Sequence, residues 1–385
     1  MQLRRCAVLL IEPREHLEFD LRVLFQGDAA FATCIAWVAL APHVDDEVEL
    51  TVDDLPILAR IGETLWLDRE TLPATFDPAR VDALLDAGIL IGDQPTHAAH
   101  RKRDERVRDA HWRGLSAVAH AFSRWQGQRA DIDPGTDGFA NVREMVEALG
   151  APPSETISRA PASAHIALPM PRRSGIDAAL FSRYTGRNYD LAATLPIATA
   201  ARLLQRTFGA QAQRELGPGA IALKKTSPSG GSLHPIEAYV LAQRVEGVGP
   251  GLYHYQPLAH TLEPMQALDT AAASALALRF VAGQHWFADA PMLVVLAARV
   301  RRNFWKYRNH PKAYRAIVLD AGHLSQTFYL LAAEAGLPAF ITAAVNEVDI
   351  EQALGLDPID DAVIAVLGCG RAANESTTVE FRGDA

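Results

Sequence analysis

Cysteine is scarce in this chain of 385 residues. Its three cysteines, Cys6, Cys34 and Cys369, lie far apart in the sequence. A disulfide framework uses an even set of cysteines, and a structural zinc site uses closely spaced pairs of ligands. The pattern therefore argues against both, and we predict no metal site.

Long apolar runs are also missing. The run at residues 6–11 is ended by Glu12 and Pro13, and the longest apolar stretch covers only residues 290–298. A secretion signal has a longer apolar segment, and a spanning helix needs about 20 apolar residues. We expect a cytoplasmic protein that does not enter a membrane.

Positive charge is not in surplus. The chain has 37 Lys and Arg against 46 Asp and Glu, which gives a formal net charge of −9. This balance disfavours nucleic acid and anionic membrane surfaces as partners. It leaves room for a local basic site that binds a single phosphate.

The length of the chain is typical of two or three domains. No internal repeat divides it. We expect a first domain at residues 1–110, a helical segment with a proline-rich linker at 111–173, and a second domain at 174–385. Five prolines and no periodicity between residues 151 and 173 mark the linker, which we expect to run extended along the surface.

Residues 1–110 combine strand and helix patterns. We expect strands at residues 6–11 and at 19–25, where apolar and polar side chains alternate, and a short helix after Asp53. Asp77 before Pro78 indicates the start of a second helix, and Gly88 indicates its end. This is typical of a small α+β domain of the winged-helix or peptide-clasp type. Recognition of a peptide and simple support of the enzyme both remain open as its role.

Residues 101–125 carry a helical stripe formed by Trp112, Leu115, Ala119 and Phe122. Core packing is a better explanation for the tryptophan than stacking on a ligand. A further short helix is expected at residues 141–149.

Helical and strand patterns alternate in residues 174–385. We expect a helix at 196–208, buried strands at 291–298 and 362–367, and a long helix through the apolar stripe at 317–335. Such alternation is typical of a layered α/β structure.

Two segments of this half are suited to holding a phosphate-bearing planar ligand. Arg183 and Arg187 flank Thr185, so two guanidinium groups and a hydroxyl can meet one phosphate. Residues 227–235 hold two glycines and two prolines, which allows close approach of backbone to a ligand. A solvated helix face and an ordinary loop are the plain alternatives.

Two more segments offer reactive or charged groups. Lys306 and Tyr307 follow a cluster of arginines (Arg299, Arg301 and Arg302) that can activate a lysine as a base, particularly if it is partly desolvated. Gly370 and Arg371 follow a predicted strand, where ligands of α/β folds commonly lie.

The order of these motifs resembles the SagB-type dehydrogenases of the nitroreductase superfamily. The matching segments are Ser-Pro-Ser-Gly-Gly-Ser-Leu-His-Pro-Ile-Glu-Ala-Tyr (227–239), Gly-Leu-Tyr-His-Tyr (251–255), Trp-Lys-Tyr (305–307), Leu-Asp-Ala-Gly-His-Leu-Ser-Gln (319–326) and Leu-Gly-Cys-Gly (367–370). They cover most of residues 174–385 and do not reach cleanly into residues 1–160. The resemblance implies an α+β protein with a three-layer α/β/α domain built on a mixed sheet. It also implies an intertwined homodimer with one FMN per subunit at each interface.

The resemblance also implies residue roles. Arg183, Thr185, Arg187 and Arg371 would hold the phosphate and ribityl end of FMN, the loop at 228–232 would pack on its ring, and Gln326 would lie near the ribityl chain. The full implied cofactor-binding set is Arg183, Thr185, Arg187, Pro228, Ser229, Gly230, Gly231, Ser232, Gln326, Gly370 and Arg371. Lys306 and Tyr307 match a Lys-Tyr pair that azoline oxidases of the family use at the substrate face.

The implied reaction is oxidation of thiazoline or oxazoline rings in a ribosomally made peptide to thiazole or oxazole. Lys306 and Tyr307 would remove a ring proton, the flavin would take the hydride, and dioxygen would reoxidise the flavin. The implied partners are a precursor peptide and a cyclodehydratase or other maturation enzyme.

The sequence departs from the family pattern at two places. Thr327 stands where many relatives have asparagine, and Tyr184-Thr185 replaces the common Arg-Ser. Other functions stay open: an NAD(P)H-dependent nitro or quinone reductase, a reductase of dehydroamino acids in a peptide, and a non-catalytic peptide-binding subunit.

Overall fold

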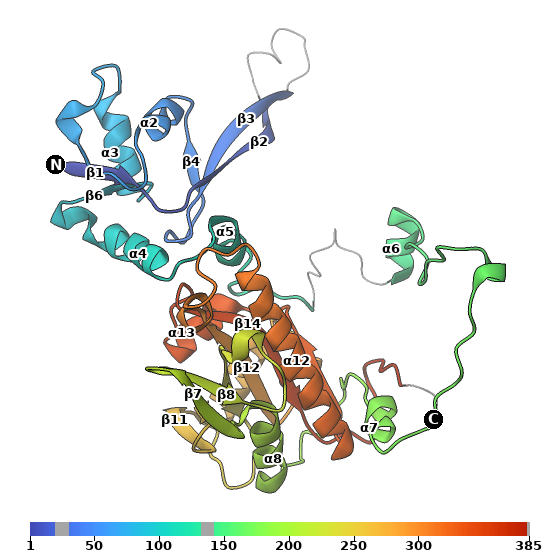
Figure 1. The fold of residues 1–385 in the computed structure, drawn as a ribbon. Coiled ribbons are helices and arrows are strands. Elements are labelled where there is room, and N and C mark those ends of the chain that lie inside the picture. The colour runs from blue at the N-terminus through green and yellow to red at the C-terminus, as the bar shows by residue number, and fades with distance from the viewer. Residues whose placement is uncertain (20–30, 132–141, 383–385) are drawn as a thin grey trace.

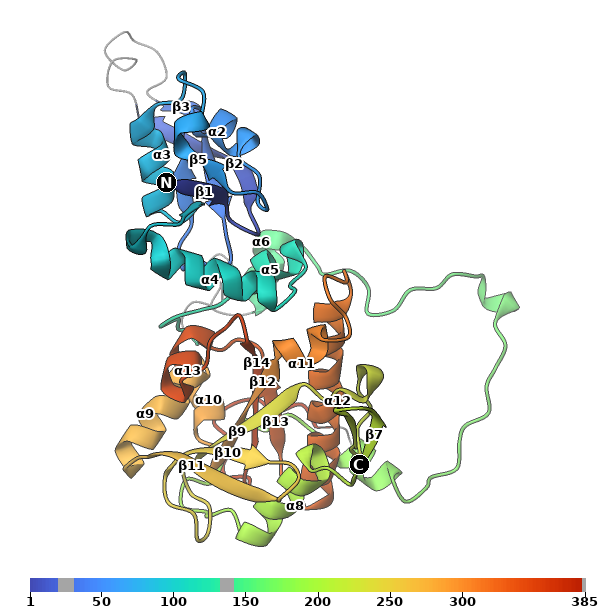
Figure 2. The ribbon, with the colours of Figure 1, turned by 60° about the vertical axis from the view of Figure 1, so that its left-hand side comes forward.

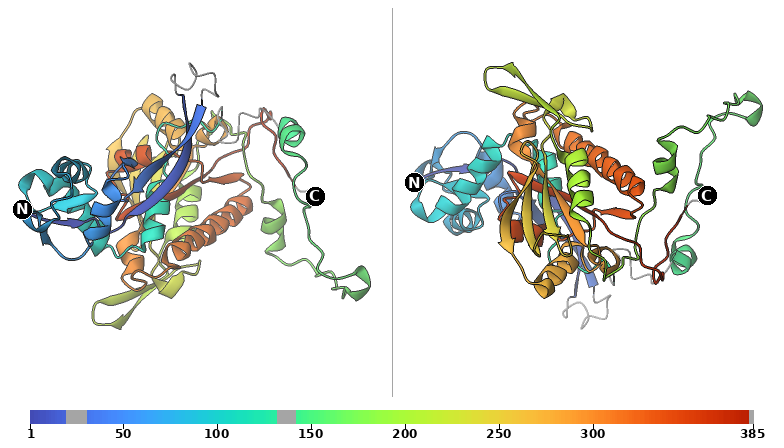
Figure 3. Two further views of the ribbon diagram at one scale, coloured as in Figure 1. Left: turned by 90° about the horizontal axis from the view of Figure 1, so that it is seen from above. Right: turned by 90° about the horizontal axis from the view of Figure 1, so that it is seen from below.

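The computed structural model describes residues 1–19, 31–131 and 142–382 (Figure 1). An N-terminal α+β region and a larger C-terminal region are joined through two helices that lie between them (Figure 2). The N-terminus lies at one end of the molecule, while the segment around residues 150–172 and the C-terminus lie at the other (Figure 3).

Two small antiparallel sheets and two helices form the N-terminal region. Its elements are β1 (Gln2–Arg5), β2 (Leu10–Phe19), β3 (Phe31–Leu40), β4 (Val48–Leu50), α2 (Asp54–Arg60), β5 (Leu67–Asp68), α3 (Pro78–Asp86) and β6 (Leu90–Gly92). The sheets have the orders β5-β1-β6 and β2-β3-β4. Buried apolar side chains from these strands and helices form one core, which includes Leu3, Ile57 and Leu85.

The helix signals in this region are confirmed. The Asp77 carboxylate accepts a hydrogen bond from the Ala79 amide, Pro78 opens α3, and Gly88 has a φ of +76° after its end. The helix expected after Asp53 is α2. Asp53 makes no capping hydrogen bond, and the Asp54 carboxylate instead accepts a bond from the Thr51 amide in the preceding turn.

The strand prediction at residues 6–11 is largely wrong. Cys6 is buried between β1 and β2, where its amide bonds the carbonyl of Ile89, and β2 begins only at Leu10. Contacts with a neighbouring segment decide this boundary, which an apolar run alone does not show. Of the strand expected at residues 19–25, Phe19 ends β2 and residues 20–25 lie outside the described residues.

The continuous helix expected at residues 101–125 is wrong. It consists of α4 (Ala98–Asp109) and α5 (Gly114–Ala121), separated by a bend where His111 has a φ of +58°. The bend buries Trp112 to 5% exposure, as expected of a core residue, and leaves Leu115 66% exposed. The stripe predicted from the sequence is therefore broken by a tertiary contact of Trp112.

Residues 142–173 contribute little to the core. Helix α6 (Val142–Leu149) matches the expected short helix, and Gly150 follows it with a φ of +81°. Residues 151–173 are exposed and lack regular structure apart from one turn at Ala162–Ala164. This segment loops away from the body of the protein, whereas we expected it along the surface (Figure 2).

The C-terminal region is built on a six-stranded sheet of order β11-β10-β9-β12-β14-β13. Its strands are β9 (Ile236–Ala242), β10 (Gly251–Gln256), β11 (Thr261–Ala267), β12 (Met292–Arg299), β13 (Ala339–Thr342) and β14 (Asp361–Cys369). Its helices are α7 (Asp177–Ser182), α8 (Ile197–Phe208), α9 (Thr270–Phe280), α10 (His285–Ala288), α11 (Val300–Phe304), α12 (Ala313–Glu334) and α13 (Glu347–Leu354), and a separate hairpin pairs β7 (Ala212–Gly217) with β8 (Ala220–Lys224).

Helices cover both faces of this sheet. Val294 and Leu296 of β12 belong to the core with α8 and α12, whereas Leu293 and Val295 belong to the core with α9 and α13. Successive side chains of a strand point to opposite faces, so the alternation places the two helical layers on opposite sides. The expected three-layer arrangement is confirmed.

The expected mixed sheet is not found among the described strands. Every ladder of the six-stranded sheet is antiparallel. Hairpins join β9 to β10 and β10 to β11, while α12 returns the chain from β12 to the far edge, so none of these connections places two neighbouring strands in parallel. Among the described residues, parallel contacts occur only as isolated bridges, one between Thr185 and Ala339 at the β13 edge and one between Leu195 and Val245.

His254 on β10 provides a pH-dependent contact within the sheet. Its ring lies 3.3 Å from Glu237 on β9 and 3.1 Å from Glu263 on β11. The hydrogen bond to Glu237 raises the pKa of His254 above its ordinary value of 6.5. The resulting stabilisation is complete below pH 6.5 and is lost as pH rises through the raised pKa.

We therefore expect His254→Gln to flatten part of the decline of melting temperature between pH 6 and pH 9. The effect should correspond to at most about 1 kcal/mol of unfolding free energy, since the ion pairs are partly exposed. Thermal melts across this range, with His165→Gln in the exposed segment as the control, check the prediction. Equal declines in the wild type and His254→Gln would contradict it.

Candidate functional site

The loop between β8 and β9 has an unusual backbone. Gly230–Ser232 form a single helical turn in which Gly231 and Ser232 have φ of +64° and +58°. Glycine adopts this conformation without strain, whereas residues with a Cβ avoid it. The loop therefore turns back on itself and presents the glycine backbone toward the segment that follows α11.

A buried carboxylate on α12 anchors this loop. Asp320 is 5% exposed and accepts hydrogen bonds from the Ser229 hydroxyl at 2.5 Å and from the Gly230 amide at 3.4 Å. Ser229 in turn accepts a bond from the His234 amide at 2.9 Å. Burial raises the pKa of Asp320, and the bonds from Ser229 and Gly230 oppose that rise.

The predicted catalytic pair lies against the same loop. A Cβ placed on Gly231 would be 2.7 Å from Lys306 Nζ and 3.1 Å from the Tyr307 hydroxyl. Lys306 Nζ also lies 5.6 Å from the centre of the Tyr307 ring. Gly231 and the adjacent pair Lys306 and Tyr307 are 75 positions apart in the sequence, and the fold brings them into contact.

We expected neighbouring arginines and partial desolvation to activate Lys306 as a base. The described residues provide neither. Lys306 is exposed, so it is not desolvated. Arg299 pairs with Glu237 and Arg301 pairs with Asp360, while Arg302 donates to the carbonyls of Leu233 and Ile221. The arginine cluster therefore serves structural contacts.

Residues 183–187 lie beside β13. The Gly186 amide donates to the Ala339 carbonyl at 2.9 Å, and the Thr185 hydroxyl is 3.1 Å from the Tyr329 hydroxyl. The Arg183 guanidinium lies 5.3 Å from the centre of the Tyr329 ring, and that of Arg187 lies 5.9 Å from the Phe287 ring. Within the described part of the chain, neither guanidinium is paired with a carboxylate.

Gly370 and Arg371 reach the same end of the sheet. The Arg371 carbonyl accepts a bond from the Asp190 amide at 2.9 Å, and Gly370 bonds the Pro338 carbonyl at 3.3 Å. Arg371 is exposed, and its guanidinium lies 3.9 Å from Asp190. The first and last predicted segments, almost 190 residues apart, are therefore neighbours.

Helix α12 connects the two groups of predicted residues. Thr327 bonds the Ser227 hydroxyl at 2.7 Å beside the glycine loop, and Tyr329 meets Thr185. Gln326, the residue before Thr327, lies on the exposed side of the helix. The stretch from Asp320 to Tyr329 rises by about 13 Å. Thr327, which stands where many relatives have asparagine, thus has a structural role, because its hydrogen bond to Ser227 connects the loop to α12.

Two contributors to this site were missed by the sequence analysis. The Glu380 carboxylate accepts bonds from the amides of Arg187 and Asn188 at 2.6 and 3.0 Å. Asn188 in turn accepts bonds from the amides of Thr377 and Thr378. These contacts hold the C-terminal segment beside the arginines, and no local pattern predicts a pairing across 190 residues.

A small polar cavity under the glycine loop was also missed. Lys225, Ser229, His234 and Asp320 line it. Burial lowers the pKa of Lys225, and it lowers the pKa of His234 to about 4, so the imidazole is neutral at pH 7. Ser229 belongs to the predicted cofactor-binding set, but the sequence did not predict that Lys225, His234 and Asp320 would lie beside it in a cavity.

No cluster of three or more His, Cys, Asp or Glu residues suited to a metal occurs within residues 1–19, 31–131 and 142–382. Over the same ranges, no helix combines the length and the apolar composition that crossing a membrane requires.

Comparison with known proteins now identifies the family. Residues 180–371 match the Nitroreductase family, and this protein is a nitroreductase-family protein. Within the family it is related to the SagB-type proteins that process peptides.

Two curated relatives carry this relationship. The trifolitoxin-processing protein TfxB of Rhizobium leguminosarum bv. trifolii is 29% identical over 153 residues, which cover 40% of this chain and 41% of that protein. The microcin B17-processing protein McbC of Escherichia coli is 27% identical over 168 residues, covering 42% of this chain and 57% of that protein. The matches thus span about half the length of these relatives.

A solved structure shares the fold over a longer stretch. A chain of the E. coli microcin synthetase McbBCD complex with truncated pro-MccB17 bound is 21% identical, with a TM-score of 0.52. The match covers 70% of this chain and 94% of that chain. Because residues 174–385 make up less than 70% of the chain, the shared fold extends into the part before residue 174.

The geometry of the glycine loop predicts unequal effects of two neighbouring substitutions. Gly231→Ala should destabilise the protein by about 1–2 kcal/mol, because alanine is strained at positive φ, and it should displace Lys306 and Tyr307. Gly230→Ala should change stability by less than about 0.5 kcal/mol, since its Cβ would lie 3.7 Å from the nearest atoms. Denaturant unfolding of the two variants checks this, and equal destabilisation would contradict the loop geometry.

Proposed function

We propose that this protein is an FMN-dependent dehydrogenase that oxidises thiazoline or oxazoline rings in a ribosomally made peptide. The observation that carries the proposal is the position of Lys306 and Tyr307 against Gly231. It supports the proposal because the two residues to which we assign the proton transfer lie beside the glycine loop of a nitroreductase-family region that is related to peptide-processing proteins.

The residues present fit FMN, which nitroreductase-family members commonly bind. Arg183 and Arg187 lack carboxylate partners in the described residues, and the Thr185 hydroxyl lies between them in sequence. Guanidinium groups of this kind bind phosphate bidentately. These three residues would hold the phosphate, with Arg371 beside them at the same end of the sheet.

The remaining predicted contacts serve the rest of the cofactor. The loop at 228–232, fixed to Asp320, would pack on the ring system, and Gln326 would contact the ribityl chain. Glycine at 230 and 231 leaves the backbone open to close approach. Helix α12 passes both groups of residues, so one rigid element sets the distance between them.

The chemistry divides between cofactor and protein. FMN, when bound, supplies the acceptor for the hydride that leaves the ring. Lys306 and Tyr307 hold the substrate face, and the lysine amine takes the ring proton while the phenol orients it. Because Lys306 is exposed in the single chain, a bound peptide or a second subunit completes its surroundings.

A second copy of the chain is part of this proposal. Leu180 and Phe181 on α7 and Val318 and Leu319 on α12 are exposed apolar residues. The two helices pack against each other, and exposed apolar side chains on them support an interface. We propose that a homodimer covers it.

A precursor peptide is the proposed substrate, and a cyclodehydratase or another maturation enzyme is the proposed partner that makes its rings. The related solved complex has a truncated precursor bound, which supports a peptide partner. We further propose that the N-terminal α+β region, predicted to resemble winged-helix or peptide-clasp domains, binds that peptide.

Single-turnover reduction of the bound flavin tests the proposal. Mixed without oxygen with a thiazoline-containing peptide, the protein should lose the visible absorbance of oxidised flavin. Lys306→Ala and Tyr307→Phe should slow this loss by about 10²- to 10⁴-fold, the usual contribution of general base catalysis. Their flavin content should not change, since neither is placed at the phosphate.

Lys312→Ala is the matched control, because Lys312 is an exposed lysine that follows the same loop. It should reduce its flavin at the wild-type rate. Full activity of Lys306→Ala would contradict the assigned base. Rapid reduction by NADPH with no response to the peptide would indicate an NAD(P)H-dependent reductase instead.

A further inference from the structure

The segment that carries Lys306 and Tyr307 contacts the bend between α4 and α5. The Asn309 amide donates to the His111 carbonyl at 2.9 Å. His111 has a φ of +58°, and this turn directs its carbonyl toward the segment and sets Trp112 against the C-terminal region. Residues far from the nitroreductase-family stretch thus touch the loop three residues after Lys306.

Trp112 packs against both ends of this segment. Its ring meets Phe304 edge-on with 4.9 Å between centroids, and it lies 5.7 Å from the Tyr314 ring. Its indole N–H donates to the Ile359 carbonyl at 2.9 Å. Phe304 precedes Lys306 by two residues and Tyr314 follows it by eight, so one side chain clamps the loop that holds the catalytic pair.

His120 supports the tryptophan from α5. Its ring stacks on Trp112 with 5.5 Å between centroids, and Nδ1 lies 3.2 Å from the Tyr314 hydroxyl. The three aromatic rings form a buried unit whose members come from α5, the bend and α12. Aromatic rings have few rotatable bonds, so such a unit holds its shape.

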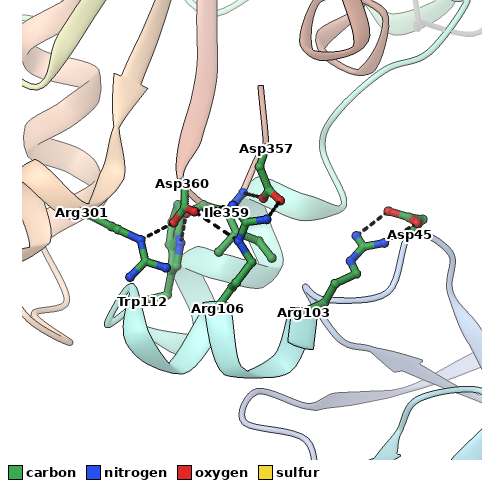
Figure 4. A network of polar contacts seen from close by, with 8 residues as sticks. All are labelled: Asp45, Arg103, Arg106, Trp112, Arg301, Asp357, Ile359 and Asp360. Atoms are coloured by element: carbon green, nitrogen blue, oxygen red, sulfur yellow. Dashed lines mark hydrogen bonds and ion pairs between the residues drawn. The ribbon is translucent and has the colours of Figure 1, made fainter. Parts of the chain in front are cut away.

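Ion pairs extend the contact in both directions (Figure 4). Arg103 of α4 pairs with Asp45 of the N-terminal region at 2.7 Å. Arg106, one turn further along α4, pairs with Asp357 at 2.6 Å and with Asp360 at 2.7 Å. Arg301 of α11 pairs with the same Asp360 at 2.6 Å.

These contacts form a continuous path. It runs from Asp45 along α4 to Asp360, and from Asp360 to α11, which leads directly into Lys306. Surface ion pairs of this kind are weak one by one, whereas the buried Trp112 contacts the same segment directly and stabilises it more.

We infer that Trp112 is a positioning residue, through which α4 and α5 set the place of Lys306 and Tyr307 relative to the glycine loop. The inference rests on the proposed function, because it concerns the base of that reaction. A displacement of about 1 Å at a reacting group can slow a reaction by about 10²-fold. The N-terminal half of the chain is thereby part of the catalytic apparatus without touching the substrate ring.

Three variants test this. Trp112→Ala removes the clamp, Trp112→Phe keeps an aromatic ring but loses the bond to Ile359, and Leu115→Ala changes an exposed residue three positions along. Amide hydrogen exchange of residues 304–313 reports on the clamp without any substrate. The flavin content and the peptide-driven rate of flavin reduction report on the site.

In Trp112→Ala we expect faster exchange at Asn309 and a reduction rate at least about 10-fold lower, with unchanged flavin content and peptide KM. Trp112→Phe should fall between this variant and the wild type, and it keeps the test valid if Trp112→Ala does not fold. Leu115→Ala should match the wild type in every measurement.

Unchanged exchange and rate in both tryptophan variants would overturn the inference. Loss of flavin in proportion to the loss of rate would also overturn it, since that indicates a general structural role. If exchange rises in the tryptophan variants while Lys306→Ala reduces its flavin at full rate, the clamp stands and the proposed function fails.

Discussion

The arrangement of the site depends on one buried carboxylate. Asp320 is enclosed in protein, and a buried charge is tolerated only where hydrogen bonds satisfy it. Ser229 and Gly230 supply those bonds, so the glycine loop cannot move away from α12 without leaving the carboxylate unsatisfied. Because the loop is held in this way, Gly231 faces Lys306 and Tyr307. The loop therefore has a defined conformation although it is rich in glycine.

Helix α12 links the glycine loop to the segment that carries the two arginines. It carries Asp320 at the glycine loop and Tyr329 beside Thr185, where the arginines at 183 and 187 lie. A long helix packed on a six-stranded sheet is rigid, so the two groups keep a constant separation. The segment after α11 lies on the other side of the glycine loop, and Trp112 packs against Phe304 at its start. The residues proposed to bind the cofactor and those proposed to act on the substrate are therefore held by different parts of the protein.

The sequence predicted what local chemistry decides. Asp77, Pro78 and Gly88 delimit α3, and the ordered motifs of residues 227–370 indicate the family and the three-layer fold. The sequence did not predict contacts that bring distant segments together. The burial of Trp112 breaks a helix that periodicity had made continuous, Glu380 reaches residues 190 positions earlier, and Asp320 looks in the sequence like any residue of a helix. The antiparallel sheet was missed for the same reason, because strand direction depends on where the chain returns. The domain limits at 110 and 173 and the residue roles remain predictions.

We propose that residues 183–187, 228–232 and 371 hold FMN. The most direct test is the visible absorption spectrum of the purified protein, together with chromatography of the small molecules that heating releases. We expect a yellow protein that releases FMN in a ratio near one per chain. If the protein is purified without its flavin, we expect it to turn yellow when FMN is added. A colourless protein that takes up no added FMN would rule out the proposed FMN site and would favour a peptide-binding subunit without a redox role.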